Sequence, residues 1–335
     1  MGVCISLWII LWLWSLSSFI LRPRKLSYER QLKREVRRGK FNNEEYQKAD
    51  KYRFNLQSDF GYILSCELIE PDHVKSNKLA SNQMESNQMI SNKIEAFQTE
   101  TDNPDMDIGK KEKKYKNIAV LCHGLGCSRC VSYKYAEIFL RLGFTVLLYD
   151  HRNHGQSGKA YTSMGYYERL DLKKVIDWCF EHYGENIRIV THGESMGAAT
   201  VLMHLGIDNR VTCAIADCSY SDLNLLLQHQ VKTFYHLPFF LIPVVSFITY
   251  LRAGFWYRDI SPIDVVRKSD VPVLFIHGKI DNFVPADMSK WMYASKRKNK
   301  ALYLVARAKH AESVSVNREG YEKRVKAFVS RYLEL

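Results

Sequence analysis

Charged side chains are missing from the first 21 residues of this 335-residue chain, and cysteine is sparse throughout it. Eight cysteines without a framework spacing exclude a small disulfide-bonded domain. The chain also lacks the composition of a disordered or collagen-like protein, because 46% of its residues are hydrophobic and 13% are aromatic. We therefore expect one substantial core with appendages.

The uncharged N-terminus predicts a membrane anchor. Residues 3–21 are apolar apart from four serines, and their number is close to the roughly 20 that a transmembrane helix needs. Two alternatives are a cleaved signal peptide, which should have a basic residue before its apolar run, and myristoylation of Gly2 with palmitoylation of Cys4. We expect residues 1–21 to form the transmembrane helix.

Positive charge follows this segment directly. The chain has a net charge of +12, and residues 22–53 alone hold 12 Lys or Arg against 5 Asp or Glu. The positive-inside rule then predicts a single-pass membrane protein whose main domain faces the cytoplasm, with residues 22–50 as a basic, helical juxtamembrane stalk. No nucleic-acid-binding motif accompanies the charge, so the expected partner is the membrane and not nucleic acid.

Residues 51–335 are predicted to form one α/β domain with a doubly wound, mostly parallel sheet. Residues 52–57 and 63–69 indicate an antiparallel hairpin around a glycine-containing turn. After residue 117, short apolar runs alternate with helical patterns, as in parallel sheets. The expected strands are 118–122, 145–149, 187–191, 213–216, 273–276 and 301–305, and the expected helices are 133–142, 168–183, 196–206, 286–294 and 320–333.

Residues 71–116 are predicted to be a low-complexity insertion. A five-residue repeat that begins with Ser-Asn runs through residues 76–95. A period of five matches neither a helix face nor a strand face, so we assign this segment no chemistry.

A strand–turn–helix pattern marks the candidate nucleophile. Residues 193–197 read Gly-Glu-Ser-Met-Gly, directly after an expected strand and before a helix-forming run. The glycines permit a tight turn that raises the Ser195 hydroxyl near a helix N-terminus. Ser195 is therefore the expected catalytic nucleophile.

A nucleophilic serine needs a base, and the base needs an orienting carboxylate. In a sheet of this kind these groups follow later strands in the order nucleophile, acid, histidine. That order selects Asp281 and His310, with Asp217 as the reserve acid. His277 is expected to be a buried structural residue.

Backbone N–H groups should stabilise the negative charge that develops on the reacting oxygen. One is expected from Met196, directly after the nucleophile, and the other from Leu125 in the loop that follows the expected strand 118–122.

These motifs resemble the α/β-hydrolase superfamily, specifically bacterial membrane-anchored hydrolases of the serine-aminopeptidase and acylglycerol-lipase-like branch. The resemblance covers about residues 50–335 and is carried by residues 122–124, 149–158, 192–197, 273–277 and 310–311. It implies an α/β-hydrolase fold with a helical cap, a catalytic triad of Ser195, Asp281 and His310, and neither metal nor other cofactor.

The segment 222–258 occupies the place of the cap and is rich in aromatic and aliphatic residues. Phe234, Phe239 and Phe240 are the candidate substrate-binding residues. The predicted function is a serine hydrolase that cleaves an ester or thioester of an apolar acyl group, in a small or lipid-like substrate, through an acyl-enzyme intermediate.

Two other functions stay open at this point. A serine peptidase or aminopeptidase-like enzyme would need a carboxylate to hold a free amine, and Glu194 or Asp222 could supply it. A non-catalytic scaffold at the membrane is the third hypothesis, and the complete set of triad residues argues against it. No obligate protein partner is expected.

Overall fold

The computed structural model describes residues 2–40, 43–71 and 117–333. The predicted insertion 71–116, apart from Pro71, and its repeat at 76–95 lie outside the described residues.

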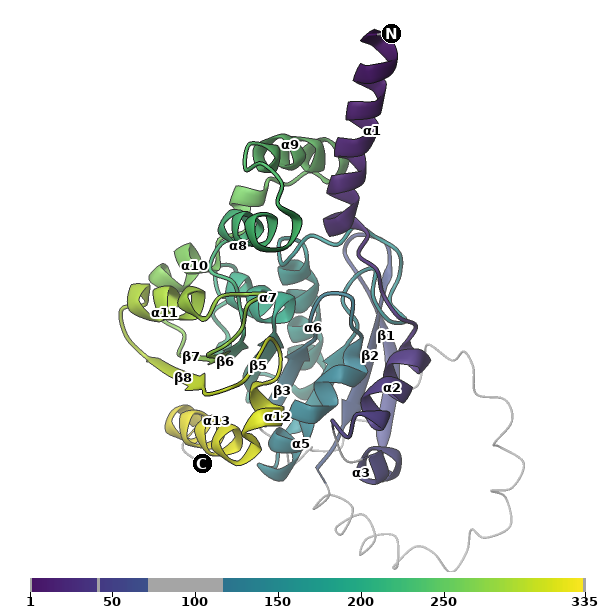
Figure 1. Cartoon of the computed structure of the whole chain (residues 1–335). Coiled ribbons are helices and arrows are strands. Elements are labelled where there is room, and N and C mark those ends of the chain that lie inside the picture. The colour runs from purple at the N-terminus through teal and green to yellow at the C-terminus, as the bar shows by residue number, and fades with distance from the viewer. Residues whose placement is uncertain (1, 41–42, 72–116, 334–335) are drawn as a thin grey trace, which may run out of the picture.

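An eight-stranded sheet forms the centre of the molecule (Figure 1). Its order is β1-β2-β4-β3-β5-β6-β7-β8, with β1 antiparallel to β2, β2 antiparallel to β4, and every other pair parallel. The predicted mostly parallel sheet is thereby confirmed. The strands are β1 (Lys51–Gln57), β2 (Ile63–Ile69), β3 (Asn117–Cys122), β4 (Thr145–Tyr149), β5 (Arg188–Glu194), β6 (Val211–Asp217), β7 (Val273–Gly278) and β8 (Lys300–Val305).

Helices cover both faces of this sheet, so strands β3 to β7 are buried along nearly their whole length. One face packs against α6 (Glu168–Tyr183), α7 (Met196–His204), α10 (Pro262–Lys268) and α11 (Ala286–Ser295). The opposite face packs against α5 (Tyr133–Arg141) and α13 (Arg318–Leu333). These two layers of side chains form the core.

The predicted cap is a group of helices beyond the carboxyl ends of the parallel strands (Figure 1). It consists of α8 (Leu223–Gln230), η2 (Val231–Tyr235), α9 (Leu241–Ala253) and η3 (Tyr257–Asp259). Short helices η1 (Arg129–Ser132) and α12 (Ser313–Val316) follow β3 and β8.

The uncharged N-terminus forms helix α1 (Gly2–Leu21), but the prediction of a transmembrane helix is wrong. Across the described parts of the chain, no helix meets the length and hydrophobicity that crossing a membrane requires. Instead, the C-terminal half of α1 packs against the protein: Ser17, Ile20 and Leu21 are buried. Arg252 of α9 donates hydrogen bonds to the Ser17 and Ser18 hydroxyls, so the serines serve an intramolecular contact.

The basic segment 22–50 contains two short helices, α2 (Tyr28–Arg37) and α3 (Asn43–Lys48), and α2 is not the solvated stalk that we expected. Tyr28, Gln31 and Glu35 are buried against the domain. The guanidinium of Arg129 lies over the Tyr28 ring, 4.6 Å from its centroid. One side of α2 is therefore part of the folded domain.

Candidate active site

Ser195 lies in the tight turn between β5 and α7, with φ +57° and ψ −115°. The turn is close-packed: a Cβ atom added to Gly193 would lie 2.2 Å from the Gly197 carbonyl oxygen, and one added to Gly197 would lie 2.2 Å from the Cys122 carbonyl oxygen. Only glycine fits at either position without moving backbone. The turn thus lifts the Ser195 side chain above the end of the sheet.

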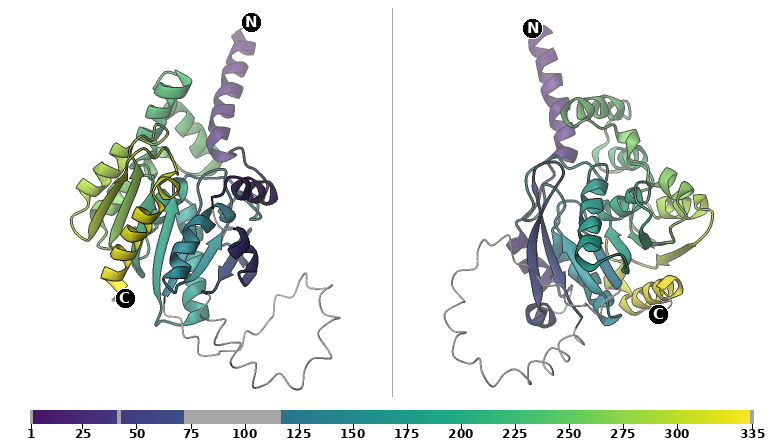
Figure 2. Two further views of the ribbon diagram at one scale, coloured as in Figure 1. Left: turned by 60° about the horizontal axis from the view of Figure 1, so that its bottom comes forward. Right: turned by 180° about the vertical axis from the view of Figure 1, so that it is seen from behind.

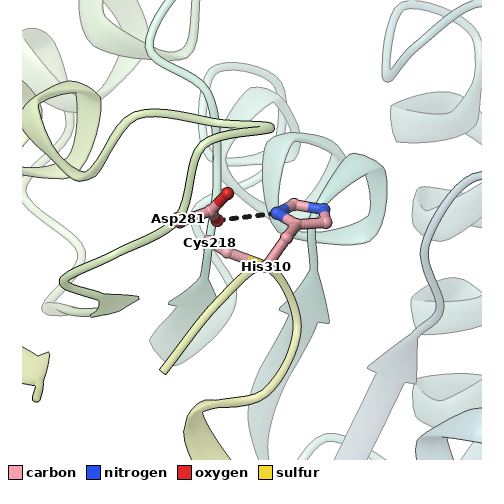
Figure 3. Close-up of side chains that lie close together, drawn as sticks. All are labelled: Cys218, Asp281 and His310. Carbon is pink, nitrogen blue, oxygen red and sulfur yellow. Dashed lines mark hydrogen bonds and ion pairs between the residues drawn. The ribbon is translucent and has the colours of Figure 1, made fainter. Parts of the chain in front are cut away.

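Asp281 and His310 follow strands β7 and β8 and reach Ser195 in a continuous hydrogen-bonded chain. His310 Nε2 lies 2.9 Å from Ser195 Oγ. On the other side of the ring, His310 Nδ1 lies 2.7 Å from Asp281 Oδ2, as Figure 3 shows. With the Nδ1 proton donated to Asp281, Nε2 is the acceptor that faces the serine hydroxyl. The arrangement can move a proton from Ser195 to His310.

The Asp281 carboxylate is fixed from several directions. Its Oδ1 accepts the backbone N–H groups of Phe283 and Val284, both at 2.9 Å. Burial opposes ionisation of Asp281, but the hydrogen bonds from His277, His310 and Val284 outweigh it and hold the pKa of Asp281 well below its usual value. Asp281 therefore stays ionised beside His310, and His277 is buried, as expected of a structural residue.

The reserve acid does not take this place. Asp217 accepts hydrogen bonds from Ser313 Oγ at 3.1 Å and from Tyr135 Oη at 3.2 Å. Burial raises the pKa of Asp217 to about 6. Its backbone carbonyl accepts the N–H of Ser195 at 2.8 Å, so it helps to hold the turn in place.

Cys218 is close to both partners of the serine (Figure 3). Its Sγ, one Asp281 oxygen and one His310 nitrogen lie within 4.8 Å of one another, which makes them possible metal ligands. Burial raises the pKa of the Cys218 thiol well above its usual value, whereas metal binding needs the thiolate. Since Asp281 and His310 also bond each other, the group is better suited to proton transfer than to holding a metal.

Leu125, in the loop after β3, packs against the cluster of buried side chains that includes Met196. Neighbouring N–H groups are occupied: that of Gly126 donates to His154 Nε2 at 3.0 Å and that of Cys127 to the Gly124 carbonyl at 3.2 Å. Within the described residues, the N–H groups of Leu125 and Met196 have no acceptor. Both groups are therefore free to bind an anionic oxygen.

Two buried histidines hold this loop, and the sequence did not single them out. His123 Nδ1 donates to the Gly124 carbonyl at 2.8 Å, because its Nε2 accepts the N–H of His151 at 3.0 Å. His154 Nδ1 donates to the Arg152 carbonyl at 2.8 Å, which leaves Nε2 to accept from Gly126. Burial lowers the pKa of both His123 and His154 to about 4, so both rings are neutral near pH 7.

Neither carboxylate considered for binding a free amine is available for it. Glu194 is buried, pairs with Lys134 and accepts the Tyr135 hydroxyl at 2.5 Å. Asp222 is the N-cap of α8, where it accepts the N–H of Leu225 at 3.0 Å. Both carboxylates have structural partners, which disfavours the aminopeptidase hypothesis.

The three candidate substrate-binding phenylalanines differ in position. The centroid of the Phe234 ring lies 6.1 Å from that of the Phe283 ring, and the Phe283 centroid lies 5.0 Å from that of the His310 ring. Phe239 and Phe240 are exposed just before α9. Phe283 was missed because its position depends on the fold around Asp281. The cluster of apolar side chains that contains Leu125 and Met196 draws on several elements, and the cap contributes Leu223, Leu226, Ile242 and Val245 to it.

Comparison with known proteins agrees with the fold. The family model of the alpha/beta hydrolase fold matches residues 119–238. The uncharacterized protein YqkD of Bacillus subtilis is 40% identical over 216 residues, which are 64% of this chain and 71% of that protein. The chain belongs to the α/β-hydrolase superfamily, a superfamily of hydrolytic enzymes, as the motifs predicted.

Solved structures agree on the fold. The Pyrococcus furiosus esterase Pf2001 superposes with a TM-score of 0.62 at 21% identity, covering 87% of this chain and 96% of that one. The acylaminoacyl peptidase of Pyrococcus horikoshii gives a TM-score of 0.58 at 15% identity, covering 88% of this chain but 44% of that one. Both likenesses concern the fold.

Proposed function

We propose that this chain is a serine hydrolase that cleaves an ester or thioester of an apolar acyl group through an acyl-enzyme intermediate. The observation that carries the proposal is the hydrogen-bonded chain from Ser195 through His310 to an ionised Asp281. The apolar side chains packed around Leu125 and Met196 favour an apolar acyl group.

In the proposed mechanism, His310 Nε2 takes the Ser195 proton as Oγ attacks the carbonyl carbon of the substrate. The carbonyl oxygen becomes an oxyanion and accepts the N–H groups of Leu125 and Met196. When the intermediate collapses, the bond to the leaving alcohol or thiol breaks and His310 returns the proton to it. Water, deprotonated by His310, then attacks the acyl-enzyme. The bond between the acyl carbon and Ser195 Oγ breaks, the acid leaves, and His310 returns the proton to Oγ.

A fluorophosphonate probe, which reacts with activated serines, tests this proposal. We expect the wild type to be labelled and Ser195→Ala and His310→Ala to lose labelling, with turnover of p-nitrophenyl esters reduced by roughly a thousand-fold or more. Asp281→Asn should lose most activity. The matched control is Asp217→Asn, at the end of strand β6, and it should retain labelling.

Substrate class is tested with esters of increasing acyl length and with aminoacyl amides. We expect turnover of esters that improves with chain length. Equal labelling of wild type and Ser195→Ala would overturn the mechanism, and cleavage of aminoacyl amides without ester turnover would replace it with a peptidase.

A further inference from the structure

One end of the molecule carries an exposed apolar surface that α1 and α9 build together, here called the α1–α9 surface. Figures 1 and 2 show α1 extending from the body with α9 packed beside it. Large apolar side chains point to solvent on both helices and on the residues just before α9, with exposed fractions of 74% for Trp8, 69% for Phe240 and 65% for Leu251. Trp12, Phe19 and Phe247 extend this surface.

The two helices are fastened to each other, so this exposure belongs to the folded state. Arg252 donates to the Trp14 carbonyl at 2.8 Å and to Ser18 Oγ at 3.0 Å. The Arg252 guanidinium also lies 4.2 Å from the centroid of the Trp14 ring. Leu13 and Leu16 pack into the cluster below the cap. The helix thus holds one side against the body while its aromatic side chains stay outside.

The two segments that build this surface carry charge of one sign. Residues 1–28 and 223–258 contain no Asp or Glu, and Asp222 and Asp259 directly flank the second segment. The same two segments carry the basic residues Arg22, Arg24, Lys25, Lys232, Arg252 and Arg258. An apolar surface with a basic border is complementary to an anionic lipid headgroup layer above an apolar interior.

We propose that the α1–α9 surface docks onto an anionic lipid bilayer, with its aromatic side chains in the headgroup region and without crossing the membrane. Tryptophan favours that region. A second copy of the chain is the less suitable occupant, because a two-fold interface would bring two basic borders together.

The segment that follows α1 connects this surface to the candidate active site. The Leu21 carbonyl accepts the N–H of Thr162 at 3.0 Å, and Lys25 Nζ donates to Asn153 Oδ1 at 2.9 Å. The Arg24 carbonyl oxygen lies 2.8 Å from the position of a Cβ on Gly126, in the loop that holds Leu125. Docking would let an apolar ester pass from lipid to Ser195. This step rests on the proposed function.

Flotation of the full-length chain with vesicles tests the docking. We expect roughly ten-fold stronger binding to phosphatidylcholine vesicles that contain phosphatidylglycerol than to phosphatidylcholine alone, weakened by salt. Trp8→Glu and Trp12→Glu should each weaken binding by roughly ten-fold. The matched control is Trp291→Glu on α11, where the tryptophan is 48% exposed, and it should bind like the wild type.

Fluorophosphonate labelling and turnover of a water-soluble ester are measured on the same samples. The docking is overturned if the wild type is labelled but does not bind vesicles, or if the Trp12→Glu variant binds vesicles as strongly as the wild type. In both cases the proposed function still stands. Vesicle binding without labelling supports the docking and overturns the function. A dimer that Trp12→Glu dissociates, without vesicle binding, would identify a second copy as the occupant.

Discussion

Lys134 and Glu194 form a buried ion pair directly beside the proposed nucleophile. Burial opposes the charge on Glu194, but Lys134 and the Tyr135 hydroxyl outweigh it and lower the pKa of Glu194. Lys134 Nζ also donates to the Ala311 carbonyl at 3.4 Å, next to His310. The pair therefore joins the turn of Ser195 to the loop of His310.

Lys134→Met should lower the free energy of unfolding by about 3–5 kcal/mol, because it leaves the Glu194 carboxylate buried without its cation. The double variant Lys134→Met/Glu194→Gln should recover much of this loss, since it removes both charges. Urea unfolding of the wild type and the two variants measures the difference. Equal stability of the single and double variants would show that the loss does not come from an unpaired charge.

The buried histidines predict that stability falls as pH is lowered from about 6.5 towards 4. Burial lowers the pKa of His123, His154 and His204 to about 4, against about 6.5 when exposed, so in this window the unfolded chain binds protons that the folded chain excludes. Each contributes at most about 1.4 kcal/mol per pH unit. Burial also lowers the pKa of His151 and His192, which act in the same direction. The raised pKa values of Asp150, Asp171, Asp217 and Asp222 act in the opposite direction and offset part of the effect.

Urea unfolding at pH 7, 6 and 5 checks this dependence. His154→Gln keeps an acceptor for the Gly126 N–H and removes one titrating ring, so the slope of stability against pH should decrease by roughly 1 kcal/mol per unit. A stability that does not change between pH 7 and 5 would contradict the neutral, buried state of these rings.

At the scale of elements, the turn between β5 and α7 sets the strictest sequence requirement. Gly197→Ala should lower stability by roughly 3 kcal/mol or more, because its new methyl group would overlap backbone. Gly124→Ala is the matched control, since its nearest neighbours would lie 3.5–3.6 Å away, and it should cost about 1 kcal/mol or less. Soluble yield and thermal unfolding of both variants test the contrast, which equal losses would refute.

The main-domain elements could be predicted because their signals are local. Apolar runs of strand length and helical periods gave β2, β4 and α6 with the boundaries that the structure has. Strand β5 was predicted to end at residue 191 but extends to Glu194, because its pairing with β6 continues to Asp217.

Contacts between distant segments account for what the sequence did not predict. Ser17 and Arg252 are 235 positions apart, and nothing in the composition of residues 1–21 indicates that one side of α1 packs on α9. The geometry of Ser195, Asp281 and His310 follows from strand order, whereas the histidines that hold the Leu125 loop require knowing which loops meet. The candidate triad could thus be predicted from the order of residues along the chain, whereas the residues around it could be identified only from the packed structure.

For the whole molecule, sheet topology predicts that residues 74–114 are dispensable for folding. Ile69 at the end of β2 pairs with Val146, and Ile118 near the start of β3 pairs with Thr145. Both residues therefore lie beside the first residues of β4, at the same end of the strands. Two strand spacings of about 4.8 Å separate these strands. The Ser195 turn lies at the opposite end of the parallel strands, after the carboxyl end of β5.

Replacing residues 74–114 by a short Gly/Ser linker should leave fluorophosphonate labelling unchanged and raise stability by about 1 kcal/mol, because a shorter loop loses less entropy on closure. A variant with the same residues in scrambled order is the control. Loss of labelling in the linker variant alone would assign this segment a role in the fold or the site.

The close approach of residues 21–25 to the Gly126 loop has a consequence for how this protein is produced. Deleting an apolar N-terminal helix is a common way to raise recombinant yield, but here a cut after Lys25 would also remove the hydrogen bonds to Thr162 and Asn153. Rate constants from such a shortened enzyme would describe an altered site. A deletion that ends before Leu13 would retain these contacts and is the better starting point for crystallisation and kinetics.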